Sequence, residues 1–195
     1  MSDSPKKGGA LPTFISFSAE ITPVTVQALI SVFADTIQKG ARDIHLLLNT
    51  PGGHVSPGIQ AYNTLMGMPI DLTTHNVGTV NSIGNAIFLA GEKRYACKAS
   101  SFMFHGVSIN FGQPARFEEK DLRERLDNLT NDQGLIAQVI NDRTNIDTKE
   151  VEGLFLQAAF VGSDEACKKG IVHEVRDVSI PDGAPFFQLN FQSAK

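Results

Sequence analysis

The sequence has little cysteine and no long hydrophobic run. Its two cysteines, Cys97 and Cys167, are too few for a disulfide framework, and we interpret them as free thiols in a reducing compartment. No apolar stretch approaches the roughly 20 residues that a membrane helix needs. The polar N-terminal segment lacks the apolar core of a signal peptide. These absences argue against a membrane or disulfide-rich protein and predict a cytoplasmic location.

The chain also lacks a patch of positive charge. Its 17 Lys and Arg residues are spread along the sequence and are outnumbered by 21 Asp and Glu, which gives a net charge of −4. Proteins that bind nucleic acid usually concentrate Lys and Arg on one surface, so we expect no nucleic-acid partner. The five histidines show no spacing typical of metal ligands. We therefore expect neither a metal ion nor a cofactor.

The length of 195 residues, 42% of them hydrophobic, is typical of one compact domain with a well-buried core. Residues 1–12 are rich in Ser, Pro, Lys and Gly and are predicted to form a flexible arm. Residues 13–178 are predicted to form the single domain. Residues 179–195 form a tail that is apolar for a terminus, so we expect it to pack on the protein or on a neighbour.

Strand-like and helix-like segments alternate along the first half of the chain. Short apolar strands are expected at 13–17, 44–48, 70–77, 93–97 and 101–104, with helices beginning near Pro23, Ser56 and Ser82. This alternation is typical of βαβ units with right-handed crossovers and predicts an α/β fold. A helical pattern over 115–143 is long for one domain and predicts a protruding helix that packs against another subunit. A further helix, 163–169, and a final strand, 171–175, are expected near the end.

Two polar residues carry the functional interpretation. Ser82 lies where a strand-like run ends and a helix of small residues begins, and His105 ends a second strand-like run. An imidazole is the usual base for a serine nucleophile, and a helix N-terminus stabilises developing negative charge. Read alone, Ser82 is more often an N-cap and His105 more often a structural histidine. Gly52 and Gly53 precede the second helix and would expose backbone N–H groups to a ligand.

Five segments, taken in order, resemble the proteolytic subunit of the ATP-dependent Clp protease, within the Clp/crotonase fold. The matching segments are Asn49-Thr50-Pro51-Gly52-Gly53, Val77 to Gly84, Ala90-Gly91 with Lys93-Arg94-Tyr95, Phe102 to His105, and Glu165-Ala166 with Gly170-Ile171-Val172. The resemblance covers about Phe14 to Val175. It implies a repeated βαβ superhelix with a long protruding handle helix at about 115–143.

The resemblance also implies the roles of individual residues. Ser82 would be the nucleophile, His105 the general base, and the backbone N–H groups of Gly53 and Ile83 the oxyanion hole. It further implies a homo-oligomeric ring, peptide or unfolded protein as substrate, and an unfoldase of the AAA+ class as partner. Ring size, the particular unfoldase and substrate preference do not follow from the sequence.

The chain departs from the family pattern at three places. The position of the family's triad aspartate is occupied by Ala158, Gly106-Val107 replaces Gln-Pro after the base, and Asn81 replaces a small Ala beside the nucleophile. Alanine cannot orient an imidazole, and loss of that carboxylate typically lowers turnover by about 10⁴. Either another group, such as Gln157 or Asp164, supports His105, or activity is low or absent.

Three functions remain open at this point. The first is a serine endopeptidase that hydrolyses peptide bonds through an acyl-enzyme, with an atypical or weakened triad. The second, suggested by Ala158, is a catalytically degenerate ring subunit or scaffold. The third is a crotonase-type acyl-CoA enzyme, which has a similar fold but is generally longer and uses carboxylates at its site. We rank it last because the sequence shows no acidic residue near Ser82 or His105.

Overall fold

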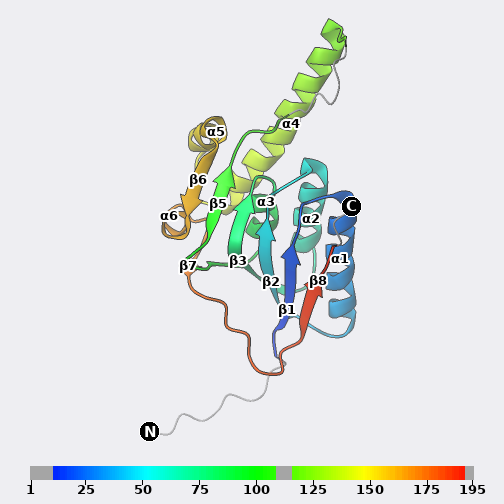
Figure 1. Cartoon of the computed structure of the whole chain (residues 1–195), viewed down its shortest axis with the longest axis vertical. Coiled ribbons are helices and arrows are strands. Elements are labelled where there is room, and N and C mark those ends of the chain that lie inside the picture. The colour runs from blue at the N-terminus through cyan, green and yellow to red at the C-terminus, as the bar shows by residue number, and fades with distance from the viewer. Residues whose placement is uncertain (1–10, 109–115, 192–195) are drawn as a thin grey trace.

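A computed structural model describes residues 11–108 and 116–191 (Figure 1). The strands of these residues are β1 Thr13–Ser18, β2 Asp43–Thr50, β3 Asp71–Asn81, β4 Lys93–Ala96, β5 Ser101–Phe104, β6 Ala159–Gly162, β7 Glu174–Val175 and β8 Phe186–Leu189. The helices are α1 Pro23–Gln38, α2 Val55–Met66, α3 Gly84–Leu89, α4 Glu119–Arg143, α5 Thr148–Gln157 and α6 Ser163–Lys168.

The strands form one sheet in the order β6-β5-β3-β2-β1-β8, with β4 joining β3 to β7 off this path. Only the β5–β6 pair is antiparallel among the described strands. Parallel neighbours need a crossover between them, and α1 and α2 supply it for β1–β2 and β2–β3. The predicted α/β fold is therefore confirmed. The carboxyl ends of β2, β3 and β5 all lie at the same end of the sheet (Figure 1).

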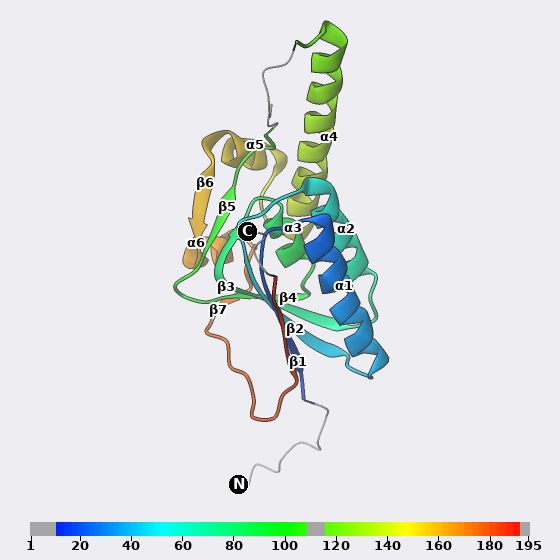
Figure 2. The same ribbon diagram turned by 45° about the vertical axis from the view of Figure 1, so that its right-hand side comes forward.

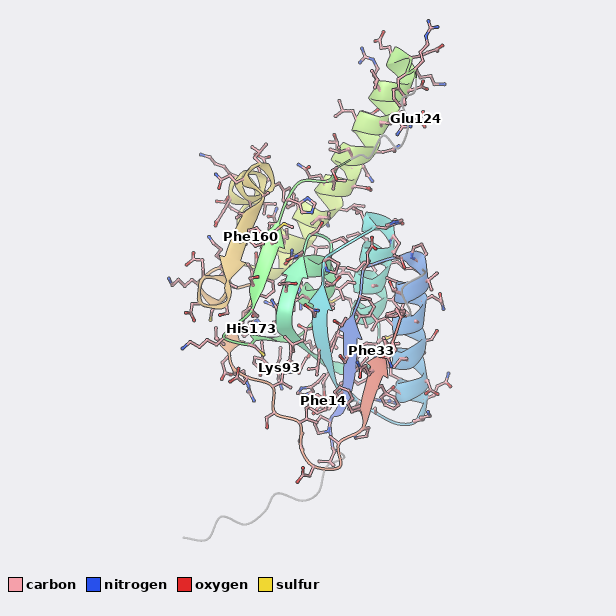
Figure 3. All side chains as sticks on the ribbon, viewed as in Figure 1. Phe14, Phe33, Lys93, Glu124, Phe160 and His173 are labelled. Atoms are coloured by element: carbon pink, nitrogen blue, oxygen red, sulfur yellow. The ribbon has the colours of Figure 1, made fainter. Side chains whose placement is uncertain are left out.

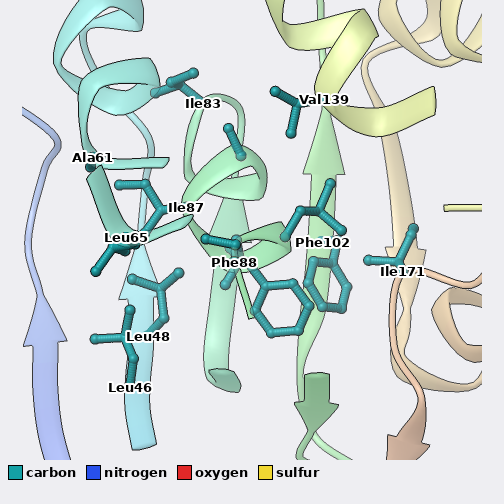
Figure 4. Packing of buried hydrophobic residues seen from close by; sticks show 14 of the residues in the cluster. Leu46, Leu48, Ala61, Leu65, Ile83, Ile87, Phe88, Phe102, Val139 and Ile171 are labelled. Carbon is teal, nitrogen blue, oxygen red and sulfur yellow. The ribbon is translucent and has the colours of Figure 1, made fainter. Parts of the chain in front are cut away.

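The core lies between the sheet and helices α1, α2 and α3, which cover one of its faces (Figure 2). Ile44, Leu46 and Leu48 alternate along β2 and point into this core with no exposed surface. Phe88 of α3 meets Phe102 of β5 edge to face, with ring centroids 4.9 Å apart (Figure 4). Each such ring contributes roughly 1.5–3 kcal/mol through burial. This contact fixes the helix that follows Ser82 against the strand that precedes His105.

A buried cation fastens the C-terminal end of α4 to the sheet. The guanidinium of Arg94, on β4, donates to the carbonyl oxygens of Arg143, Gly170 and Ile171 at 2.9–3.0 Å. Burial, and then the nearby charge of Arg143, lowers the pKa of Arg94 to about 10. The side chain stays protonated at neutral pH and joins β4 to two other backbone segments, the end of α4 and residues 170–171.

The long helix α4 projects from the domain. Its buried residues, Ile136, Val139 and Ile140, all lie in its C-terminal half. The N-terminal half leaves the sheet behind, and Glu124 lies far from it (Figure 3). There Leu122 is 49% and Leu126 61% exposed. The helix begins at Glu119 rather than at 115, which lies outside the described residues.

Further predicted elements were wrong in their bounds. The strand expected at 70–77 extends over Asp71–Asn81. The final strand was expected at 171–175 but covers only Glu174–Val175, because the N–H groups of Ile171 and Val172 both donate to the carbonyl of Ala166 and close the end of α6. The helix expected from Ser82 begins at Gly84. In the C-terminal tail, β8 pairs with β1, so this segment extends the sheet. Of the predicted arm, residues 1–10 lie outside the described chain.

None of the helices in the described ranges is both long and apolar enough to cross a bilayer.

Candidate active site

Ser82 occupies a tight turn between β3 and α3. Its φ is +56°, in the left-handed region that costs a residue with a side chain roughly 1–2 kcal/mol. Ile83 is the N-cap of α3 and makes no side-chain capping bond. The N-cap alternative for Ser82 is therefore wrong. The turn is held by backbone hydrogen bonds from Ser82 N to the Met103 carbonyl at 2.8 Å and from Asn85 N to the Ser82 carbonyl at 3.0 Å.

The glycine turn after β2 lies directly against Ser82. Gly52 and Gly53 have φ values of +95° and +146°. A Cβ on Gly52 would stand 2.7 Å from Ser82 Cβ, and one on Gly53 would stand 2.2 Å from the Ile21 carbonyl oxygen. Only glycine fits these two positions. In the described chain, the N–H groups of Gly53 and Ile83 have no hydrogen-bond acceptor.

His105 immediately follows β5, and a neighbouring backbone carbonyl holds its ring. Nδ1 lies 2.7 Å from the carbonyl oxygen of Gly106. Because a carbonyl oxygen can only accept, Nδ1 carries the proton and Nε2 is left as the basic nitrogen. The N–H of Gly106 in turn donates to the Phe155 carbonyl at 3.1 Å, which ties this peptide to α5.

Ala158 and His105 both lie one residue beyond the paired part of β5 and β6. The last registered pair of β5 and β6 is Phe104 with Ala159. His105 follows Phe104 and Ala158 precedes Ala159, so these are the next residues beyond the two strands. Ala158 is exposed and has a φ of +49°. Neither Gln157 nor Asp164, the two alternatives raised by the sequence, forms a hydrogen bond with His105 in the part of the chain described.

Ser82, His105 and Gly53 share one open cavity of about 630 Å³. The other lining residues are Glu20, His54, Val55, Ser56, Pro57, Val107, Ser108 and Asp132. Ile83 has no exposed surface and its side chain packs under the turn against Gly58. Across residues 11–108 and 116–191, no hydrogen bond joins the Ser82 hydroxyl to the His105 ring.

Two carboxylates were missed by the sequence reasoning. Glu20 precedes α1 and Asp132 lies in α4, and both line the cavity that holds Ser82 and His105. The expectation of no acidic residue near the pair was therefore wrong. Asp132 comes to the cavity only because α4 packs against helices α2, α3 and α5, and no local motif marks it. Within the described residues no three His, Cys, Asp or Glu side chains are grouped to hold a metal ion.

The fold and the cavity define an α/β protein in which a serine hydroxyl and an imidazole share a glycine-flanked pocket. Residues 13–179 match the family model described as Clp protease. This match covers most of the chain, so the protein belongs to the Clp protease family. The resemblance drawn from the sequence motifs is confirmed at the level of the family.

Proposed function

We propose that this chain is a serine-type endopeptidase that hydrolyses peptide bonds through an acyl-enzyme. The observation that carries the proposal is the shared cavity: Ser82, His105 and Gly53 line one pocket, although they come from three separate strand ends. The family match favours a peptidase over a crotonase-type enzyme.

In the proposed mechanism, the Oγ of Ser82 attacks the carbonyl carbon of the scissile bond while Nε2 of His105 takes its proton. The N–H groups of Gly53 and Ile83, which have no acceptor in the described part of the chain, would stabilise the oxyanion. His105 then returns the proton to the leaving amine, and an acyl-enzyme on Ser82 remains. A water molecule, deprotonated by His105, hydrolyses this ester and restores the serine.

The Gly106 carbonyl replaces part of what a triad aspartate does. Its hydrogen bond to Nδ1 selects the tautomer in which Nε2 is basic, and it restrains the rotation of the ring. It carries only a partial charge, however, so it stabilises the imidazolium of the transition state less than a carboxylate would. We therefore propose a weakened triad and slow turnover.

We also propose that the protein acts as an assembled ring. The N-terminal half of α4 projects from the domain and exposes Leu122 and Leu126, a surface suited to packing against a second copy. Peptide or unfolded protein would be the substrate, an unfoldase of the AAA+ class would be the partner, and the cytoplasm would be the location. The division into an arm, one domain at 13–178 and a tail at 179–195 also remains our proposal.

A catalytically degenerate ring subunit is the second candidate. Two observations favour it: Ala158 brings no carboxylate to His105, and no hydrogen bond joins Ser82 to His105 within the described residues. A free enzyme often has a loosely aligned nucleophile and base that close only on substrate. The two candidates therefore differ in whether the assembled protein acylates at all.

A serine-directed fluorophosphonate probe separates these candidates. We expect the wild-type chain to be labelled, the Ser82→Ala variant to resist labelling, and peptide hydrolysis to fall at least about 10³-fold in that variant. Ser31→Ala is the matched control, because Ser31 lies exposed on α1 and away from the cavity. Equal labelling of wild type and Ser82→Ala would refute the peptidase. Absence of both labelling and hydrolysis in the wild type would establish the degenerate subunit.

A further inference from the structure

The side chain of Asn85 joins the nucleophile turn to the strand that carries the base. Asn85 is the second residue of α3 and is 1% exposed. Its Nδ2 donates to the Ser82 carbonyl at 2.9 Å and to the Met103 carbonyl at 2.9 Å. A helical side chain leans toward the N-terminus of its helix, which is how this amide reaches back over Ser82.

The two acceptors are the groups that fix the geometry of the site. The Met103 carbonyl also accepts from Ser82 N, so its two hydrogen bonds come from the turn and from Asn85. Met103 lies two residues before His105 on the same chain segment. Asn85 therefore ties the Ser82 carbonyl to the strand that leads to the imidazole, through the same Met103 carbonyl that accepts from Ser82 N.

The orientation of the amide indicates that Asn85 acts as a donor. In the described chain its Oδ1 is buried and has no hydrogen-bond partner, whereas both donor bonds are made. The opposite orientation would place Oδ1 against two carbonyl oxygens, which would repel it. A buried acceptor without a partner costs roughly 1–3 kcal/mol. The site thus tolerates an unfavourable group to retain this pair of donors.

The hydrogen bonds of Asn85 also act on a strained residue. Ser82 has a positive φ, which persists only where the surrounding structure holds it. Without the Asn85 amide, one backbone bond on each side of Ser82 would remain to oppose relaxation of the turn. A shift of about 1 Å in a reacting atom can lower a rate by roughly 10²-fold.

We propose that Asn85 is a positioning residue for the Ser82 nucleophile, an inference that rests on the proposed peptidase function. Asn85 does not touch substrate in this assignment. It fixes the direction of the Ser82 hydroxyl relative to His105 through the Ser82 and Met103 carbonyl groups. Loss of the Asn85 amide should therefore lower kcat and leave KM nearly unchanged, because the cavity that binds the peptide is lined by other residues.

The test compares Asn85→Leu, which fills the same volume without donors, with Asn85→Ser. A serine at this position can donate to the carbonyl three residues earlier, so it restores the bond to Ser82 but not the one to Met103. We expect kcat per folded chain to fall at least tenfold in Asn85→Leu and to an intermediate value in Asn85→Ser. KM should stay within about threefold of wild type in both variants. Active-site titration with fluorophosphonate corrects for any unfolded fraction.

Asn76→Leu is the matched control. Asn76 is also fully buried on β3. Its Nδ2 donates to the Ser101 carbonyl of β5 at 2.8 Å and its Oδ1 accepts from Gly78 N at 3.0 Å, and in the described chain it makes no hydrogen bond with Ser82 or Met103. We expect it to lower the melting temperature while kcat per folded chain stays within about twofold.

Each result decides the proposal. If Asn85→Leu, or Asn85→Ser where the leucine variant does not fold, keeps the wild-type kcat per titrated site, the positioning role is wrong while the peptidase stands. A fall in kcat of equal size in Asn76→Leu would also overturn it, because the effect would then be general destabilisation. A wild type that neither labels nor hydrolyses peptide overturns both proposals together.

Discussion

Two residues of the described chain, Ser82 and Ala158, combine a side chain with a positive φ, and Ser82 lines the cavity. Such conformations tend to gather at functional sites, where the surrounding contacts hold them. In this protein the strain at Ser82 follows from the glycine turn and the Met103 carbonyl, which fix its backbone from two directions. At Ala158 it ends helix α5 and turns the chain into β6.

The position of Ala158 predicts a gain of activity from one substitution. Ala158→Asp introduces a carboxylate one residue beyond the Phe104–Ala159 pair, where His105 follows on the other strand, and aspartate tolerates the left-handed conformation better than alanine does. We expect kcat/KM for a peptide substrate to rise about tenfold, because the imidazolium of the transition state gains a negative neighbour. Steady-state hydrolysis by the assembled protein measures the effect.

Ala158→Asn is the control for this prediction, since it has nearly the same shape and no charge. Equal rates for Ala158→Asp and Ala158→Asn would show that charge at this position does not reach His105. A rate for Ala158→Asp below that of wild type would show that the ring is better held by the Gly106 carbonyl alone.

Local motifs single out Ser82 and His105, which we propose as nucleophile and base, but not the groups that hold them. Ser82 and His105 stand in short segments with recognisable neighbours, so the sequence alone singled them out. The Gly106 carbonyl is a backbone group that no side-chain pattern reveals. Asn85 and Asp132 reach the site through packing between distant elements. These contacts depend on tertiary structure and carry no local signature.

At the scale of elements, periodicity predicted the helices and strands better than their ends. The alternating apolar residues of β2 and the long helical pattern of α4 both correspond to elements in the structure. In each, the apolar residues recur at the period of the element and so lie on one face. The start of α3 was wrong by two residues. Small residues around Ser82 suit a helix and a tight turn equally, and the Gly52–Ser82 contact that decides between them is non-local.

The exposed half of α4 predicts how assembly responds to a charge. Leu126 is 61% exposed, so Leu126→Asp should leave the fold and the far-ultraviolet circular dichroism unchanged. If this exposed part of α4 packs against a second copy, the carboxylate would be buried in the interface and should weaken association at least about tenfold. Sedimentation velocity across a concentration series measures the shift toward smaller species.

Asp127→Ala, at the exposed neighbouring position, is the control and should assemble as wild type does. Identical sedimentation of Leu126→Asp and wild type would exclude this part of α4 from the interface.

At the scale of the whole molecule, a pair of buried histidines on the sheet predicts a response to acid. His45 on β2 and His75 on β3 lie on the face opposite the helices, with Nδ1 of His45 2.9 Å from Nε2 of His75. His75 is 4% exposed, and its Nδ1 is buried without a partner in the described chain. Burial, followed by the charges of His45 and Arg176, lowers the pKa of His75 to about 4.

The neighbours of His45 act in both directions. Burial lowers the pKa of His45 most, the Asp43 carboxylate 3.4 Å away raises it, and the cations Lys93 and Arg176 lower it further. The net direction is downward, as for His75. Both rings are therefore neutral in the folded protein at neutral pH. One of the two facing nitrogens carries a proton and donates it to the other in a hydrogen bond.

This arrangement predicts a loss of global stability as the pH falls. The folded pKa of His75, about 4, lies below the ordinary value of 6.5, so the unfolded chain binds a proton first. The contribution of neutral His75 to the free energy of unfolding is fully present above pH 6.5. It is lost progressively as the pH falls from 6.5 to 4. From pH 7.5 to pH 5 the free energy of unfolding should fall by about 2 kcal/mol from His75 alone. Urea denaturation followed by circular dichroism at the two pH values measures this difference.

The variant that isolates the histidine pair is His75→Phe, which keeps an aromatic ring beside Tyr95 and removes the titrating group. Between pH 7.5 and pH 5, the free energy of unfolding of this variant should fall less than that of wild type. The difference between the two decreases should be most of the about 2 kcal/mol attributed to His75. His54→Gln is the control, because His54 is exposed and should leave the pH dependence as it is. If the curves of wild type and His75→Phe run parallel, acid sensitivity arises elsewhere and the buried pair is protonated without penalty.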